Sequence, residues 1–117
     1  MKEYLRDKDD FHRAAGNRYV LTPAFTRENK VAVINLRRKL QCSYPQCMGL
    51  LSSAGRLWLT GKRRTLEVAQ RLLAIEGIET GIELEAGSKN AISIGPETWH
   101  SDAVLKALHK RTLHLDD

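Results

Sequence analysis

The chain has 117 residues, of which 42% are hydrophobic and 28% charged, a composition typical of a single soluble globular domain. Its longest stretch without a charge, residues 40–55, is too short and too polar to span a bilayer. The N-terminus lacks the apolar segment of a secretory signal, so a cytoplasmic protein is expected.

The net charge of +5 is unevenly distributed along the chain. Residues 29–66 contain eight cations and no acid, whereas residues 76–102 contain six acids and Lys89 as their one cation. The sequence therefore predicts a basic half and an acidic half, and a basic surface favours an anionic partner.

The first 20 residues are polar and are predicted to form an arm or a short helix. Residues 21–117 are predicted to form one α/β domain. Thr22 and Pro23 are the residue types that cap and begin a helix. The apolar spacing of residues 26–41 predicts that helix.

Pro45 and Gly49 predict a break after this first helix. Residues 49–61 then predict one or two strands, which end at a glycine. These elements supply the frame for the basic half of the chain.

The second half of the chain alternates helix and strand. Residues 64–76 have the apolar face of a helix, which Gly77 ends. Residues 78–85 alternate apolar and acidic residues, which predicts a half-buried strand, and 91–95 predict a strand opposite it. Residues 101–114 predict a final helix.

Together these elements predict an α+β fold, a small α/β sandwich with two or three helices on a mainly antiparallel sheet. In the last helix, Lys110, Arg111 and His114 lie in the final turns, where the helix dipole favours cations.

Three cations at the start of the helix 64–76 break that same rule, because a helix N-terminus carries partial positive charge. Free backbone N–H groups and added cations suit an anion, and arginine grips phosphate through two hydrogen bonds. The sequence therefore predicts a surface for a polyanion, with nucleic acid favoured over a lipid surface. Trp58 either adds a stacking face or packs in the core, as tryptophan does more often. The candidate residues are Arg37, Arg38, Lys39, Arg56, Trp58, Lys62, Arg63 and Arg64.

Two other interpretations of the cations remain open. They are ordinary solvated surface, or they pair with the acids of the strand 78–85, within the fold or in a second copy of the chain. A protein partner or a homo-oligomer would then use Glu79, Glu83 and Glu85.

The sequence offers no catalytic motif and implies no cofactor. The segment GRLWLTGKR differs from a P-loop, because five residues separate Gly55 from Gly61 where four are required. Arg63 also stands where a P-loop has the Ser or Thr that holds magnesium. We therefore expect a binding module that is not an enzyme.

Two cysteines, Cys42 and Cys47, are expected to be free structural thiols. A zinc site would need two further ligands, for which the candidates are His12, His100, His109 and His114.

The glycine-bounded segment GRLWLTG, the helix after it and the pair Gly77-Ile78 resemble the BON domain over residues 34–85. The resemblance implies a non-catalytic module that binds phospholipid surfaces or other proteins. It carries over Gly55, Gly61 and Gly77, with structural roles. The chain differs from that family in a shorter central helix and in residues 90–117, which have no counterpart there.

Overall fold

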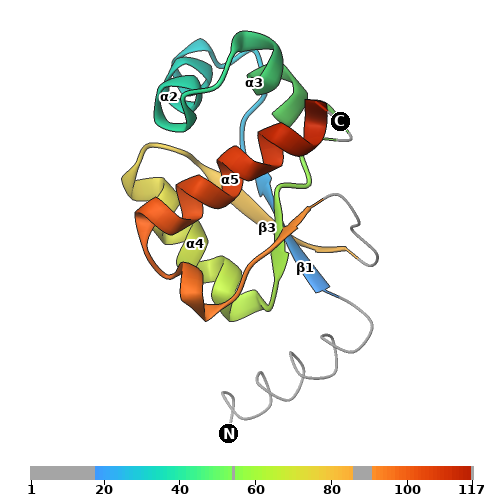
Figure 1. Ribbon diagram of the computed structural model, residues 1–117, viewed down its shortest axis with the longest axis vertical. Coiled ribbons are helices and arrows are strands. Elements are labelled where there is room, and N and C mark those ends of the chain that lie inside the picture. The colour runs from blue at the N-terminus through green and yellow to red at the C-terminus, as the bar shows by residue number, and fades with distance from the viewer. Residues whose placement is uncertain (1–17, 54, 86–90, 117) are drawn as a thin grey trace, which may run out of the picture.

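The computed structural model describes residues 18–53, 55–85 and 91–116 (Figure 1). The predicted arm therefore lies outside the described residues up to position 17. Four strands form one sheet in the order β3-β1-β2-β4. They are β1 (Arg18–Pro23), β2 (Leu59–Gly61), β3 (Thr80–Glu85) and β4 (Ile92–Ser93). β1 is antiparallel to both β2 and β3, whereas β2 and β4 are parallel.

β1 is a central strand and replaces the predicted helix start. Val20 and Leu21 point to opposite faces and are both fully buried. Thr22 and Pro23 continue the pairing with β3, opposite Gly81 and Thr80. The prediction that Thr22 caps a helix is wrong, because two neighbouring strands decide the conformation of this segment.

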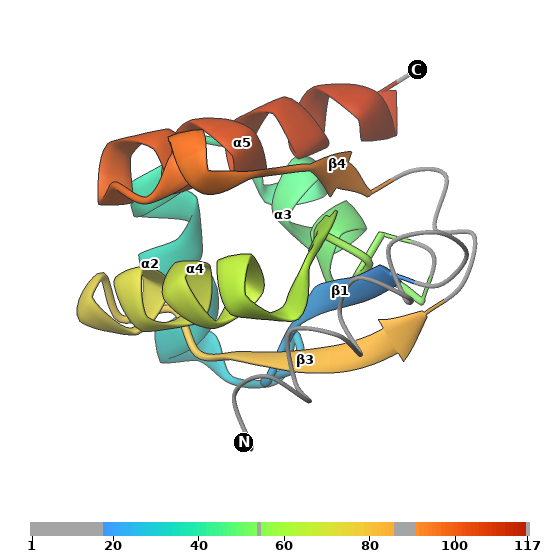
Figure 2. The same ribbon diagram turned by 90° about the horizontal axis from the view of Figure 1, so that it is seen from below.

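The helices are α2 (Lys30–Leu40), α3 (Tyr44–Leu50), α4 (Arg63–Ile75) and α5 (Ser101–Asp116), with a short 3-10 helix, η1 (Pro96–Thr98). Asn29 caps α2 by accepting a hydrogen bond from the Ala32 N–H at 3.1 Å. α4 packs on β1, β2 and β3, and α5 packs across α2, α3 and α4 (Figures 1 and 2). The predicted α+β class is confirmed, and the described part of the chain has four α-helices on a mixed sheet.

α3 occupies the segment where a break was predicted. Ser43 accepts a hydrogen bond from the Gln46 N–H at 3.2 Å, and the Gln46 side chain accepts one from the Ser43 N–H at 3.0 Å. This capping box provides partners for two N–H groups at the start of α3. Pro45 fits in the first turn because proline has no N–H group that would need a partner. The break is limited to the residues between α2 and α3.

β4 is not the partner of β3, since the two strands lie at opposite edges of the sheet. The Ile92 N–H donates to the Trp58 carbonyl at 3.0 Å, and the Ile94 N–H donates to the Thr60 carbonyl at 2.9 Å. β4 therefore pairs with β2, and the predicted pairing with β3 is wrong.

α4 ends as the sequence predicted. Gly77 has φ +83°, and the Ile78 N–H donates to the Leu73 carbonyl at 2.8 Å, which is the hydrogen bond of a Schellman cap. The Asn35 side chain donates to the Glu76 carbonyl at 2.8 Å and so ties α2 to this end of α4.

Among the described residues, no helix combines the length and the apolar character needed to cross a membrane.

Candidate polyanion-binding surface

The α4 cluster, Lys62, Arg63 and Arg64, lies where β2 passes into α4. Lys62 is the N-cap residue of α4, and its side chain makes no capping hydrogen bond. The first turn of α4 contains no acid, and all three cations are exposed. Nothing in helix electrostatics favours positive charge at this position.

An aromatic residue lies against the α4 cluster. The Arg63 guanidinium carbon lies 5.6 Å from the centroid of the Tyr19 ring, a cation–π distance. Tyr19 is opposite Gly61 in the β1–β2 pairing, which places the ring beside the start of α4.

The α2 cluster, Arg37, Arg38 and Lys39, forms the last turn of α2. Its charges agree with the dipole of that helix. The Arg37 guanidinium carbon lies 5.6 Å from the ring centroid of Tyr44, which is 54% exposed. The Lys39 ammonium is 2.8 Å from a carboxylate oxygen of Glu76.

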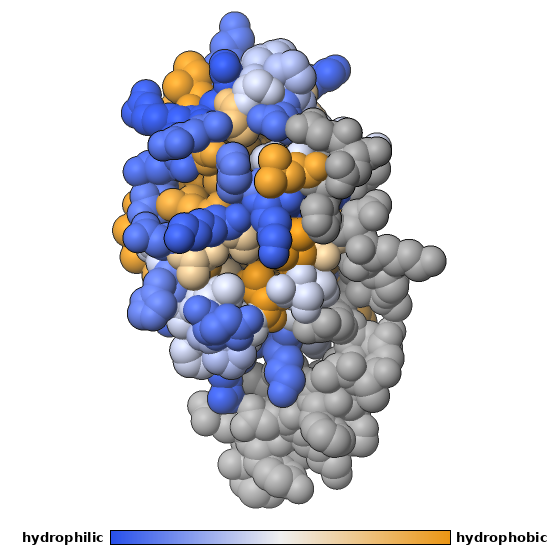
Figure 3. All heavy atoms as spheres, viewed as in Figure 1, coloured by the Kyte–Doolittle hydropathy of each residue, from blue (hydrophilic) through white to orange (hydrophobic). Residues whose placement is uncertain are grey.

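The structure separates the two clusters instead of merging them. Lys39 pairs with Glu76, the residue that caps the C-terminal end of α4, whereas the α4 cluster is at its N-terminal end. α4 has 13 residues, so at 1.5 Å per residue the clusters lie about 20 Å apart. Figure 3 shows hydrophilic side chains over α2, α4 and α5 on one face of the molecule, with apolar side chains between them.

α5 adds cations that the sequence analysis did not include in the site. Lys39 and Lys106 line one hollow between α2 and α5, together with Asp102 and His109, so Lys106 extends the α2 cluster. His109 Nδ1 lies 3.0 Å from the Leu40 carbonyl oxygen, which fixes the imidazole against α2. The helical spacing of Lys106 and Lys110 could have indicated their shared face.

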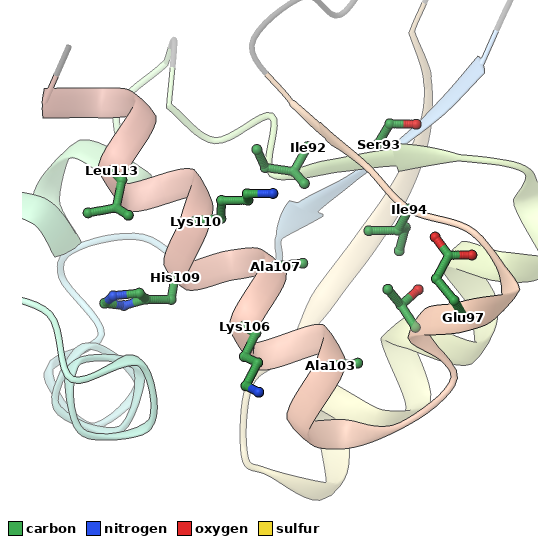
Figure 4. A pocket seen from close by; sticks show the side chains of 11 residues that line it. Ile92, Ser93, Ile94, Glu97, Ala103, Lys106, Ala107, His109, Lys110 and Leu113 are labelled. Atoms are coloured by element: carbon green, nitrogen blue, oxygen red, sulfur yellow. The ribbon is translucent and has the colours of Figure 1, made fainter.

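A groove of about 450 Å³ lies on the other side of α5, between that helix and β4. Ile92, Ile94 and Ala107 give it apolar walls. In Figure 4, Lys110 extends towards Ile92, whereas His109 points to the opposite side of α5. The groove combines an apolar surface with a cation at its edge.

Trp58 does not belong to the candidate site. Its side chain is fully buried, and its indole N–H donates to the Leu50 carbonyl at 2.9 Å. Its ring therefore packs under α3 and has no free face for a base. Tyr19 and Tyr44 are instead the aromatic residues that lie beside the cations.

Arg56 and Arg111 also differ from the exposed cations. Arg56 is half-buried in the loop before β2. Arg111 was predicted to complement the α5 dipole, but it is buried, and its Nε–H donates to the Leu57 carbonyl at 3.1 Å. Burial lowers the pKa of Arg111, because desolvation disfavours the charged form.

The acids of the β3 segment form a separate surface. Glu79 and Glu83 are exposed, and Glu83 lies opposite Val20 on the face of the sheet that points away from Leu21 and Ile82. The predicted apolar face of β3 is buried at Thr80, and Leu84 is half exposed.

Cys42 and Cys47 are free and buried. Within the described ranges, no group of three or more His, Cys, Asp and Glu side chains is placed to hold a metal ion.

Comparison with known proteins finds no family model, no curated protein and no solved structure that matches this chain.

Proposed function

We propose that this protein is a non-enzymatic module that binds nucleic acid, with single strands favoured. The observation that carries the proposal is the pairing of each exposed cation cluster with a tyrosine. Binding to single strands combines cations that contact phosphates with aromatic rings on which bases stack. Both elements are present at each end of α4.

The separation of the clusters favours an extended ligand. A single phosphate would contact one cluster, whereas a strand of several nucleotides can reach both across about 20 Å. Lys106 of α5, which lines the same hollow as Lys39, would continue this path beside the α2 cluster. Contacts of this kind are mostly to phosphate and give little sequence selectivity.

The electrostatics of the α4 cluster supports the same proposal. An anion at the start of α4 would relieve the repulsion between the three cations and accept hydrogen bonds from free backbone N–H groups. The α2 cluster, by contrast, is already stabilised by its helix dipole.

The test is a fluorescence-anisotropy titration with labelled single- and double-stranded DNA and RNA, at low and near-physiological salt. It compares the native chain with the Lys62→Ala/Arg63→Ala/Arg64→Ala and Arg37→Ala/Arg38→Ala/Lys39→Ala variants. Arg27→Ala/Lys30→Ala is the control, because both cations are exposed but lie at or before the start of α2. Salt-dependent binding that both cluster variants weaken and the control retains supports the proposal.

Absence of binding to every nucleic acid at low salt would overturn it. The resemblance to the BON domain makes a phospholipid surface the next ligand to test for the same cations. Vesicles with and without anionic lipid would measure it.

A second candidate function, self-association, is favoured by an apolar patch away from the α4 cluster. Val31 is 79% exposed and Ile34 is 55% exposed, and both line one hollow on α2. The hollow of about 470 Å³ joins Val31 to Arg38 and Glu79, which have opposite charges. In a symmetric dimer, Arg38 of one copy would face Glu79 of the other.

Light scattering over a range of protein concentrations tests this second candidate. A dimer that Arg38→Glu disrupts and Arg38→Glu/Glu79→Arg restores would support it. A monomer at all concentrations would exclude it.

A further inference from the structure

Cys42 and Cys47 are brought together by the way α3 begins. Cys42 precedes the cap residue Ser43, and Cys47 is the fourth residue of α3. In a capped helix these two positions face each other and usually contain a pair of apolar side chains, the hydrophobic staple. Here both positions of the staple are thiols.

The backbone on each side of the pair is fixed. The Cys42 N–H donates to the Arg37 carbonyl at 3.2 Å, beyond the left-handed Gln41 that ends α2. The Cys47 N–H donates to the Ser43 carbonyl at 2.9 Å. Backbone hydrogen bonds therefore hold both positions of the staple in place.

The two sulfur atoms have different surroundings. Cys47 is fully buried, and its sulfur lies 4.0 Å from the Val33 carbonyl oxygen. Cys42 is also buried, but 8% of its surface remains exposed. Both cysteines belong to the same buried cluster of side chains, together with Val33, Leu36 and Leu50.

We propose that Cys42 and Cys47 are a reactive dithiol that a hydroperoxide converts to an intramolecular disulfide. This inference is independent of the proposed binding of nucleic acid. Cys42 is the thiol that attacks, and Cys47 is the thiol that resolves the intermediate.

The chemistry balances with one hydroperoxide molecule. The Cys42 thiolate attacks a peroxide oxygen, the O–O bond breaks, and the leaving oxygen takes a proton to become water or an alcohol. Cys42 is then a sulfenic acid. The Cys47 sulfur attacks the Cys42 sulfur, the S–O bond breaks, and the hydroxyl leaves as water with the Cys47 proton. The two thiols lose two electrons, and the peroxide gains them.

The pKa values of the two thiols determine which of them reacts first. The hydrogen bond from Cys47 and the charge of Arg37 lower the pKa of Cys42 to about 7, against the effect of burial. The hydrogen bond to Cys42 and burial raise the pKa of Cys47. The thiolate is the nucleophile, so Cys42 reacts first.

The test treats the reduced full-length chain with hydrogen peroxide near one equivalent, blocks remaining thiols with N-ethylmaleimide and measures the mass. The expected product has lost two hydrogen atoms and takes up no maleimide, and peptide mapping links Cys42 to Cys47. Dithiothreitol should restore both thiols. The rate should rise about tenfold between pH 6 and pH 8, as the Cys42 thiolate forms.

Variants separate the two roles. Cys47→Ser should stop at a Cys42 sulfenic acid that dimedone traps, and Cys42→Ser should leave Cys47 unreactive. On the α5 side, His109 binds the carbonyl of Leu40, close to Cys42 in sequence, so His109→Gln is included in the pH series. If the oxidation rate depends on pH in the same way in His109→Gln, the group that titrates is the Cys42 thiol.

Three results would overturn the inference. The first is a disulfide that forms in urea but not in the folded chain, since the pair would then be only a buried staple. The second is equal reaction of both cysteines in the single variants. The third is a disulfide between two chains instead of within one.

Discussion

The two cation clusters contain the same kinds of residue but stand in opposite relation to their helices. The α2 cluster ends a helix, where positive charge is favoured, and it is further stabilised by Tyr44 and Glu76. The α4 cluster begins a helix, where positive charge is disfavoured, and Tyr19 is the aromatic contact of Arg63. Charges that stabilise their own helix can be explained without a ligand, whereas charges that oppose it call for another reason.

This difference gives the α4 cluster more weight as a candidate site than the total positive charge does. It also predicts that stability and ligand binding respond differently to changes at the two ends of α4.

The largest effect is expected on nucleic-acid binding. Lys62→Ala/Arg63→Ala/Arg64→Ala should weaken binding to single strands by about 10- to 100-fold at low salt, because up to three phosphate contacts are lost. The slope of log affinity against log salt should become shallower by up to about 2, since each contact with a single strand contributes about 0.7. Arg37→Ala/Arg38→Ala/Lys39→Ala should have a smaller effect, since Lys39 already pairs with Glu76. Anisotropy over a salt series measures the affinity of both variants. A larger loss of affinity in the α2-cluster variant than in the α4-cluster variant would contradict this prediction.

The next effect is on stability and has opposite signs at the two clusters. Removing the three cations of the α2 cluster should lower the free energy of unfolding by about 1–2 kcal/mol, because favourable dipole interactions and the partly exposed Lys39–Glu76 pair are lost. Removing the α4 cluster should leave stability unchanged or raise it by up to about 1 kcal/mol. Urea unfolding of both variants measures this, and a loss of equal size at both ends would contradict it.

A single substitution at Lys62 should raise the stability of the fold and weaken its binding to nucleic acid. Lys62 has the extended backbone of a cap residue, φ −69° and ψ 150°, but no capping side chain. Lys62→Asp should add a cap and raise the free energy of unfolding by about 1 kcal/mol, while it weakens binding to nucleic acid. Lys62→Gln is the matched control for loss of charge without an acid. If Lys62→Asp fails to stabilise the chain, the electrostatic account of α4 is wrong.

The smallest effect concerns Arg37, which lowers the pKa of Cys42 after the larger contribution of the Cys47 hydrogen bond. Because the folded pKa of Cys42, about 7, is below its ordinary value of 9.0, the thiolate contributes stability above pH 9 that is lost as the pH falls through about 7. Arg37→Gln should raise the pH at which this stability is lost by a fraction of a pH unit, because the Arg37 charge no longer lowers the pKa of Cys42.

The rate of iodoacetamide alkylation against pH measures the Cys42 titration in the native chain and in Arg37→Gln. Arg38→Gln is the control, because it removes an equal charge that does not contribute to the Cys42 pKa. An equal shift in both variants would show a general effect of net charge.

Long periodic segments could be predicted from the sequence, and the short pairings could not. α4 and its end at Gly77 follow from apolar spacing and from one residue that adopts positive φ readily. α3 was missed because Pro45 was interpreted as a break, although the Ser43–Gln46 capping box was visible in the sequence. β4 was assigned to the wrong neighbour because alternation predicts a strand but not the strand it pairs with.

The candidate site divides in the same way. Charge alone placed seven of the eight cations of residues 29–66 in the candidate site, and six of those seven are exposed. The burial of Trp58 and the approach of Tyr19 to Arg63 depend on contacts between segments far apart in the chain.

The sequence by itself determined the α+β class, the amphipathic helix α4 and the excess of cations in one half of the chain, because these depend on residue type and local spacing. The tertiary structure alone decided that the clusters lie at opposite ends of α4 and that α5 extends one of them. It also decided that both cysteines are buried at the start of α3. The physical reason is that local patterns set which face of an element is apolar, whereas packing among all the elements sets which faces meet.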